Sequence, residues 1–364
     1  MAPSHLFSFE NGVLFVYNLR DKICACVLAA SSLFLSGYIS LSKGENITRI
    51  ALDSPLFKKS STVNTTPSTQ NYTIKFRATN KEESASSTIE TSSKSTTRAD
   101  TKKVGKITKE FISPYSANTK YNNVYLNNQS GESINIKTLL SSYKNNIDMT
   151  SDEPQVLIMH THATENYSKS NDGYYRKSDL ERTSNVKNNV IGIGNEVERV
   201  LKDGGVSVIH DKTLHDSPSY SGSYNRSYTT VENYLKKYPS IKVVLDIHRD
   251  AIGSSDNLIK PVAEINKKDA AQVMICVGSN TGEVDYFPNW KKNLTLGLKL
   301  QQTLEVLYPG LARALFLAKE RCYNQNLSNG SIIIEFGTNA NTYSEAEYSA
   351  KLVGNALVTL FKNG

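Results

Sequence analysis

Hydrophobic and polar positions follow two different spacings along the second half of the chain. Five short apolar runs have the character of buried strands, at residues 155–159, 206–209, 241–247, 272–277 and 332–334. Apolar side chains recur every three or four positions, as in a helix, at residues 186–201, 228–237 and 290–307. A capping box at Thr342 and Glu345 predicts a last helix that runs to about residue 361. Strands that alternate with helices predict an α/β fold with a largely parallel sheet sandwiched by helices.

The folded domain predicted from this pattern covers residues 151–364, and a separate segment, 111–150, leads into it. Within that segment two short alternating runs, 124–126 and 134–136, flank a turn-rich stretch. This arrangement predicts a β-hairpin at the start of the folded part of the chain.

The N-terminal part of the chain has a different character. Residues 23–41 are uncharged and mostly apolar, and as a helix they would span about 28 Å, close to the thickness of a bilayer core. Basic residues just before this run predict that residues 1–22 stay in the cytoplasm and that the rest crosses the membrane. A cleaved signal peptide is the alternative interpretation. Residues 42–110 are rich in Ser, Thr, Asn and Lys, which predicts a disordered tether.

Charge and cysteine content narrow the classes of function. The net charge of +7 and the pI near 8.9 favour polyanionic surroundings such as nucleic acid, anionic lipid or an acidic cell wall. The sequence has neither a basic recognition helix nor an aromatic and basic RNA-binding motif, so no nucleic-acid partner is predicted. The part of the chain after the apolar segment has no Cys-x-x-Cys pair, so a disulfide framework is not predicted.

Residues with the chemistry of a metal site follow three of the predicted strands. His162 and Glu165 come directly after the first, His248 ends the third, and Glu335 ends the last. Because parallel strands end at the same edge of a sheet, these side chains should meet there. A catalytic zinc ion needs three protein ligands and one open position, and His162, Glu165 and His248 would supply them. Glu335 would then be the general base. His160 is the alternative ligand.

Further polar residues near these strand ends suggest supporting roles. Asp246 or Asp250 would hold the second ring nitrogen of a ligand histidine. Arg249 and Arg226 would bind an anionic group of the substrate. Any one of these residues taken alone is more simply a structural or solvent-exposed side chain, so the prediction depends on their joint occurrence.

Seven ordered stretches of the sequence resemble the stage II sporulation protein P family. They are residues 160–167, 208–212, 216–220, 245–251, 308–310, 323–328 and 333–342. Thr338 departs from the family pattern, which leads us to expect a second glycine there. The resemblance implies an N-acetylmuramoyl-L-alanine amidase fold that depends on zinc, is similar to zinc carboxypeptidases and hydrolyses peptidoglycan. On this basis His162, Glu165 and His248 correspond to ligands and Glu335 to the base.

The resemblance also implies where and with what the protein acts. It implies cleavage of the bond between muramic acid and the stem peptide, with endopeptidase activity on cross-links. The implied partners are the sporulation protein D transglycosylase and sporulation protein M at the engulfing membrane of the mother cell, with the catalytic domain outside the membrane. Two alternatives remain from the residues themselves: a metallopeptidase of carboxypeptidase type, and a catalytically inactive module that binds the cell wall.

Overall fold

The computed structural model describes residues 102–280 and 287–363, together with the backbone of five strands nearer the N-terminus. The chain divides into two compact units, Met1–Thr96 and Thr97–Gly364. In the first unit, β1 (Ser4–Glu10), β2 (Val13–Arg20) and β5 (Thr73–Lys75) form one antiparallel sheet. A second antiparallel pair is formed by β3 (Gly37–Lys43) and β4 (Asn46–Leu52).

The predicted membrane anchor falls mostly outside this description. Residues 23–36 are not among the described residues, and 37–41 belong to β3. None of the described helices combines the length and the apolar character needed to cross a membrane. The range predicted as a disordered tether, 42–110, contains β4 and β5, and it also contains a strand of the second unit.

An eight-stranded sheet forms the centre of the second unit. Its strands, in spatial order, are β11 (Val208–His210), β9 (Val156–Met159), β12 (Val243–Asp250), β17 (Ser331–Thr338), β15 (Val273–Gly278), β16 (Leu315–Ala318), β8 (Val124–Asn128) and β7 (Thr119–Tyr121). Neighbours are parallel except β17 with β15 and β8 with β7. The mixed α/β class predicted from the sequence is therefore confirmed.

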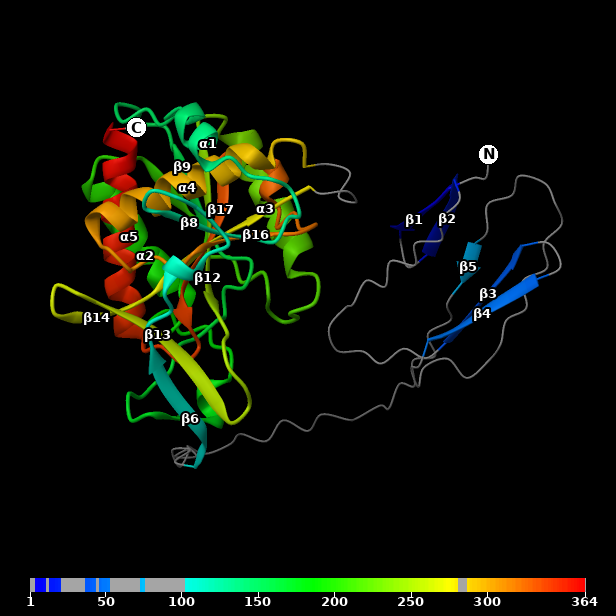
Figure 1. Cartoon of the computed structure of the whole chain (residues 1–364), viewed down its shortest axis with the longest axis horizontal. Helices are drawn as coiled ribbons and strands as arrows, with labels where there is room; N and C mark the ends of the chain where they lie inside the picture. Colours follow the sequence, from blue (N-terminus) through cyan, green and yellow to red (C-terminus); the bar gives the residue numbers. More distant parts are fainter. Residues whose placement is uncertain are drawn as a thin grey trace, which may run out of the picture. The chain divides into compact units, whose positions relative to one another are not determined.

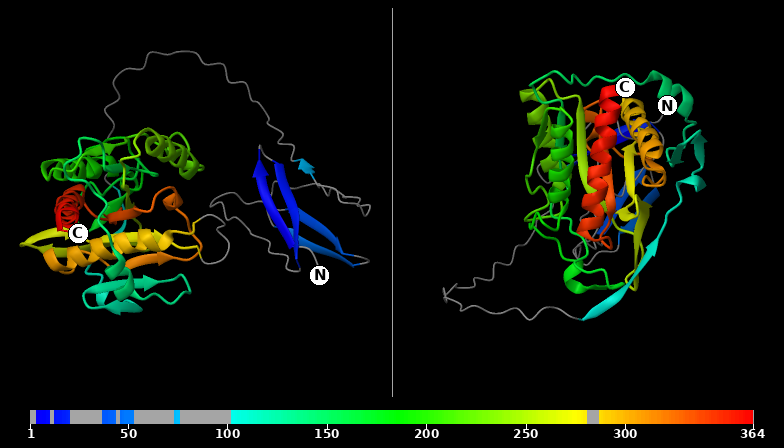
Figure 2. Two further views of the ribbon diagram at one scale, coloured as in Figure 1. Left: turned by 90° about the horizontal axis from the view of Figure 1, so that it is seen from above. Right: turned by 90° about the vertical axis from the view of Figure 1, so that its left-hand side faces the viewer.

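Helices cover both faces of this sheet. On one face lie α2 (Val190–Asp203), α4 (Trp290–Leu307) and α5 (Tyr343–Asn363), and the right-hand view of Figure 2 shows α5, in red, between the other two. The other face is covered by α3 (Ser223–Lys237). Side chains of β9 alternate accordingly. Val156 and Ile158 join the large core with α2, whereas Leu157 and Met159 pack with Val231 of α3.

A smaller sheet places the start of the folded unit earlier than predicted. Its order is β10 (Tyr174–Arg176), β6 (Lys103–Glu110), β13 (Asn257–Ile265) and β14 (Lys268–Ala271). Figure 1 shows β6 beside β13, from which it is distant in the sequence. The side chains of β6 are exposed or half-buried, so the strand carries no apolar run. The strand is held by backbone hydrogen bonds to β10 on one side and β13 on the other, and these pairings cannot be read from the sequence pattern.

Two other elements differ from the predictions. The hairpin before the domain is formed by β7 and β8, and the run 134–136 is not its second strand. Instead, Asn135 caps α1 (Ile136–Ser142) by accepting a hydrogen bond from the Thr138 backbone N–H (3.0 Å). The helix expected at 228–237 begins five residues earlier, at Ser223, after Gly222 with its positive φ of 77°.

Candidate active site

The ends of β9, β12 and β17 bring the predicted residues to one edge of the main sheet. His248 of β12 lies directly beside Glu335 of the parallel strand β17. Ile334 and Phe336 point into the large core, so Glu335 between them faces the opposite side, the side covered by α3. The alternation of side chains along each strand therefore decides which face carries the site.

His162 lies in the turn that follows β9, among aromatic rings. Its ring is stacked on that of Tyr220 (4.4 Å between centroids) and meets the ring of His248 edge-on (5.3 Å). The hydroxyl of Ser223, the first residue of α3, lies 3.2 Å from its Nδ1, which leaves Nε2 for another partner. Burial, and then the charge of His248, lowers the pKa of His162 to about 3. The imidazole is therefore neutral, the state that binds a metal ion.

Glu165 lies close to the two histidines predicted as ligands, His162 in its own turn and His248 of β12. Its backbone N–H donates to the carbonyl of His162 (3.2 Å), which closes the turn between them. Its Oε2 lies 3.6 Å from Nδ1 of His248 and accepts a hydrogen bond from the backbone N–H of Arg249 (3.1 Å). Arg182 lies 3.8 Å from the other carboxylate oxygen. The structure thus brings His162, Glu165 and His248 together.

Of the two aspartates predicted to support a ligand histidine, Asp246 is the one that contacts the ring of His248. Its Oδ1 lies 2.8 Å from Nε2 of His248, an ion-pair contact without the alignment of a hydrogen bond. Burial alone would lower the pKa of His248, but Asp246 and the other nearby carboxylates raise it to about 10. Burial alone would likewise raise the pKa of Asp246, and the charge of His248 with hydrogen bonds from Thr161 lowers it instead. Asp250 instead pairs with Arg313 (2.8 Å).

Glu335 is half-buried, with one carboxylate oxygen in the interior, as expected of a proton acceptor at an active site. Its Oε2 is buried and has no hydrogen-bond partner among the residues that the structure describes. Burial raises its pKa to about 8; the charge of His248 opposes this increase, while Glu165 and Asp250 add to it. Thr338, at the unexpected non-glycine position nearby, is buried and its hydroxyl donates to the carbonyl of Ile259 (2.8 Å).

His160 belongs to a different cluster. Its Nδ1 lies 2.9 Å from the carbonyl oxygen of Ile247, and its Nε2 lies 2.8 Å from Nε2 of His210. Nδ1 of His210 in turn lies 3.0 Å from Glu198 of α2. These contacts place His160 on the α2 side of the sheet, so the structure groups His162, and not His160, with His248.

The two predicted arginines are held by backbone carbonyl groups. Arg249 donates through Nε to the carbonyl of Asn166 (3.1 Å). Arg226 donates through Nε to the carbonyl of His215 (2.6 Å) and through a terminal nitrogen to that of Ser219. The guanidinium of Arg226 therefore fastens the loop before α3, and that of Arg249 fastens the turn that carries Glu165.

Several residues of the site were not predicted from the sequence. Arg182 pairs with buried Asp216 and lies over the exposed ring of Tyr220. Tyr224 meets His162 edge-on, with 5.6 Å between ring centroids. These residues lie in polar loops and at a helix start, where no local pattern signals that they approach the strand ends.

The side-chain types of the three predicted ligands suit zinc, although their donor atoms do not surround a common position. Within the part of the chain that the structure describes, no three His, Cys, Asp or Glu side chains are arranged so that they could hold a metal ion. Two imidazoles and one carboxylate are nevertheless the ligands of a catalytic zinc site. Oε2 of Glu335 is buried without a hydrogen-bond partner in the described residues, so it is a polar atom that a bound group could satisfy.

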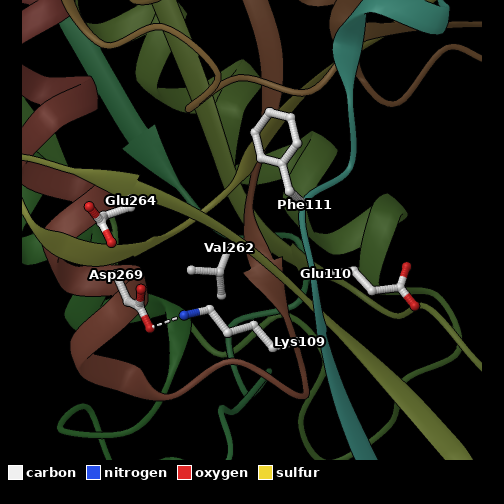
Figure 3. Close-up of a pocket in the computed structure, with 6 residues that line it drawn as sticks. All are labelled: Lys109, Glu110, Phe111, Val262, Glu264 and Asp269. Atoms are coloured by element: carbon white, nitrogen blue, oxygen red, sulfur yellow. Dashed lines mark hydrogen bonds and ion pairs between the residues drawn. The ribbon is translucent and has the colours of Figure 1, made fainter.

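A hollow elsewhere on this unit does not have this chemistry. It has a volume of about 480 Å³. Figure 3 shows its lining side chains, among which Lys109 and Asp269 form an ion pair (2.6 Å). Its lining contains none of the predicted site residues and consists of Lys109, Glu110, Phe111, Val262, Glu264 and Asp269.

Comparison with known proteins identifies relatives of the chain. The Stage II sporulation protein P of Bacillus subtilis (strain 168) is 27% identical over 222 residues, which cover 58% of this chain and 52% of that protein. The chain thus spans about half the length of the curated relative that it matches.

Solved structures give weaker similarities. The CwlD amidase from Clostridioides difficile, in complex with the GerS lipoprotein, has a TM-score of 0.38 at 12% identity and covers 58% of this chain and 100% of its own. An N-acetylmuramoyl-L-alanine amidase from Clostridium difficile 630 has a TM-score of 0.34 at 16% identity, with 58% and 95% covered. At these TM-scores the likeness supports no further conclusion.

A model of the family described as Stage II sporulation protein P (SpoIIP) matches residues 44–358, so the chain belongs to this family.

Proposed function

We propose that the protein is a zinc-dependent peptidoglycan hydrolase of sporulation. It would act as an N-acetylmuramoyl-L-alanine amidase, with endopeptidase activity on cross-links. The observation that carries this proposal is the meeting of His162, Glu165, His248 and Glu335 at adjoining strand ends, in a chain of the stage II sporulation protein P family. Two imidazoles, a carboxylate ligand and a separate buried carboxylate are the parts that metal-assisted amide hydrolysis requires.

His162, Glu165 and His248 would hold the zinc ion. When bound, zinc would polarise the amide carbonyl and lower the pKa of water toward ~7. Each histidine ring has a neighbouring side chain at one nitrogen, and His248, whose pKa is raised to about 10, would release a proton when the ion binds. Ser223 contacts Nδ1 of His162, and Asp246 contacts Nε2 of His248, so each ring has one nitrogen engaged and one directed to the site.

Glu335 would move the proton that hydrolysis requires. The reaction needs a base that accepts a proton from water and returns it to the leaving nitrogen. A carboxylate with a pKa near neutrality suits both steps, and burial raises the pKa of Glu335 to about 8. Since Oε2 of Glu335 has no hydrogen-bond partner in the described part of the chain, it is available for this exchange.

The site of action is proposed from the N-terminal apolar segment and the net charge of the chain. We propose that the apolar segment predicted at residues 23–41 anchors the chain in the membrane as a single span, with the hydrolase domain outside, although the structure places residues 37–41 in β3. The net charge of +7 favours contact with an acidic cell wall. We place this activity at the engulfing membrane of the mother cell, with the sporulation protein D transglycosylase and sporulation protein M as partners.

The test is digestion of purified peptidoglycan by the full chain, with and without a zinc chelator. The expected products are free stem peptides with a new amino terminus, lost on chelation and restored by added zinc. Shortening of peptides from the carboxyl terminus would instead indicate a carboxypeptidase. Binding to the wall without cleavage, even after the protein D partner is added, would indicate an inactive wall-binding module and would contradict the proposal.

A further inference from the structure

Tyr224 is an aromatic side chain at the site that has no assigned role. It is the second residue of α3, and its half-buried ring meets the ring of His162 edge-on, with 5.6 Å between centroids. The ring of Tyr323 lies on another side of it, at 6.1 Å. Among the residues that the structure describes, none accepts or donates a hydrogen bond at the hydroxyl of Tyr224. Within the described part of the chain the hydroxyl is therefore not engaged by another residue and is available to a bound substrate.

A strained loop fixes the position of Tyr224. Tyr323 and Asn324 are consecutive non-glycine residues with positive φ, at 51° and 58°. Side chains disfavour this conformation, which persists where the surroundings enforce it, often at functional sites. Here it lets the Asn324 amide donate to the carbonyl of Tyr224 (2.8 Å) and to the hydroxyl of Ser227 (3.0 Å). The start of α3 is thereby held beside His162.

The hydroxyl of Tyr224 is a phenol O–H, which can donate a hydrogen bond to an oxygen atom that gains negative charge. Tyr220 also lies beside His162, but its side chain is exposed, whereas that of Tyr224 is half-buried.

We propose that Tyr224 is a further catalytic residue, whose hydroxyl donates a hydrogen bond to the scissile carbonyl oxygen as that oxygen gains negative charge. The inference rests on the proposed amide hydrolysis. Water adds through its oxygen to the carbonyl carbon, Glu335 takes the water proton, and the C=O π electrons move onto the oxygen that Tyr224 binds. When the C–N bond breaks, those electrons return to form the C=O bond. The C–N pair passes to nitrogen, which takes the proton from Glu335.

The first test replaces the hydroxyl alone. Tyr224→Phe in the full chain should lower kcat for stem-peptide release from peptidoglycan by about 100-fold, the usual effect of removing one such donor. KM should change by less than about threefold, because the hydrogen bond forms chiefly in the transition state. Tyr228→Phe, one turn further along α3, is the matched control and should retain the wild-type kcat. An unchanged kcat in a folded Tyr224→Phe protein would overturn the proposal.

A second measurement covers the case in which Tyr224→Phe does not fold. Fluorinated tyrosines at position 224 keep the shape of the ring and make the hydroxyl progressively more acidic. If the hydroxyl is the donor, kcat should change steadily along the series. If the ring only packs against His162, kcat should stay constant, which would overturn the proposal. A wild-type chain that releases no stem peptide would instead refute the proposed amidase function, and the role of Tyr224 with it.

Discussion

Asp246 connects the two histidines of the candidate site through a single buried carboxylate. It accepts hydrogen bonds from the backbone N–H (2.8 Å) and the hydroxyl (2.7 Å) of Thr161, next to His162 in the sequence. The same carboxylate contacts His248. Because it is buried, its interactions are stronger than they would be in water. The position of both imidazoles therefore depends on one side chain that would not itself touch the metal.

Asp246→Asn should weaken zinc binding and activity, by about 10- to 100-fold, because an amide no longer provides the charge that orients His248. Asp250→Asn is the matched control, since Asp250 contacts Arg313 and not a ligand histidine. Its zinc affinity should stay within about threefold of the wild-type value. Titration with a competing zinc chelator measures both affinities. Equal losses in the two variants would show that Asp246 has no special part in holding the site.

At the scale of elements, a buried ion pair joins the smaller sheet to the last helix. Lys260 of β13 lies 2.8 Å from Oε1 of Glu345 in α5, and both side chains are buried. Oε2 of Glu345 also accepts from the Thr342 backbone N–H (3.0 Å), and Thr342 accepts in return from the Glu345 backbone N–H (3.4 Å). The predicted capping box is thus confirmed, and its glutamate has a second partner from a distant strand.

Lys260→Met should lower the free energy of unfolding by about 3–5 kcal/mol, because it leaves the Glu345 carboxylate buried without its countercharge. Adding Glu345→Gln should recover part of this loss, since the neutral amide no longer needs a cation. Urea unfolding of the full chain measures both variants. A single variant as stable as the wild type would mean that the pair does not hold β13 against α5.

The helices and strands that were predicted correctly are those with a clear local pattern of apolar residues. The helix at residues 290–307 is confirmed to the residue, and Val156–Met159 is a strand as expected. β6 and β10 were missed because they form strands only by pairing with segments that are distant in the sequence. The sequence singled out His162, Glu165 and His248 because they follow apolar runs, and the structure places them close together. Tyr224 was missed because only the tertiary structure brings the start of α3 to His162.

For the whole molecule, the position of β6 decides where the folded unit begins. β6 lies between β10 and β13 in the smaller sheet and pairs with both. Its removal would break backbone hydrogen bonds on two sides and expose two strand edges. The boundary predicted at residue 111 would therefore cut into the folded unit.

A truncated chain that begins at residue 111 should be less stable than one that begins at residue 97. A loss of several kcal/mol would lower Tm by about 10 °C in a unit of this size. The chain from residue 97, which keeps β6, should have the Tm of the same unit in the full-length protein. Thermal unfolding followed by circular dichroism tests this. Equal Tm values for the two truncated chains would show that β6 adds no stability.

The central claim concerns four side chains, so the most direct measurement separates metal binding from catalysis among them. Zinc content and stem-peptide release would be measured together for the full chain, for Glu335→Gln and for His248→Ala. We predict about one zinc ion per chain in the wild type and in Glu335→Gln, and none in His248→Ala. Only the wild type should release stem peptide at its full rate, with a loss of about 10³-fold in Glu335→Gln. Glu335→Gln that retains the wild-type rate, or His248→Ala that keeps both zinc and activity, would contradict the account.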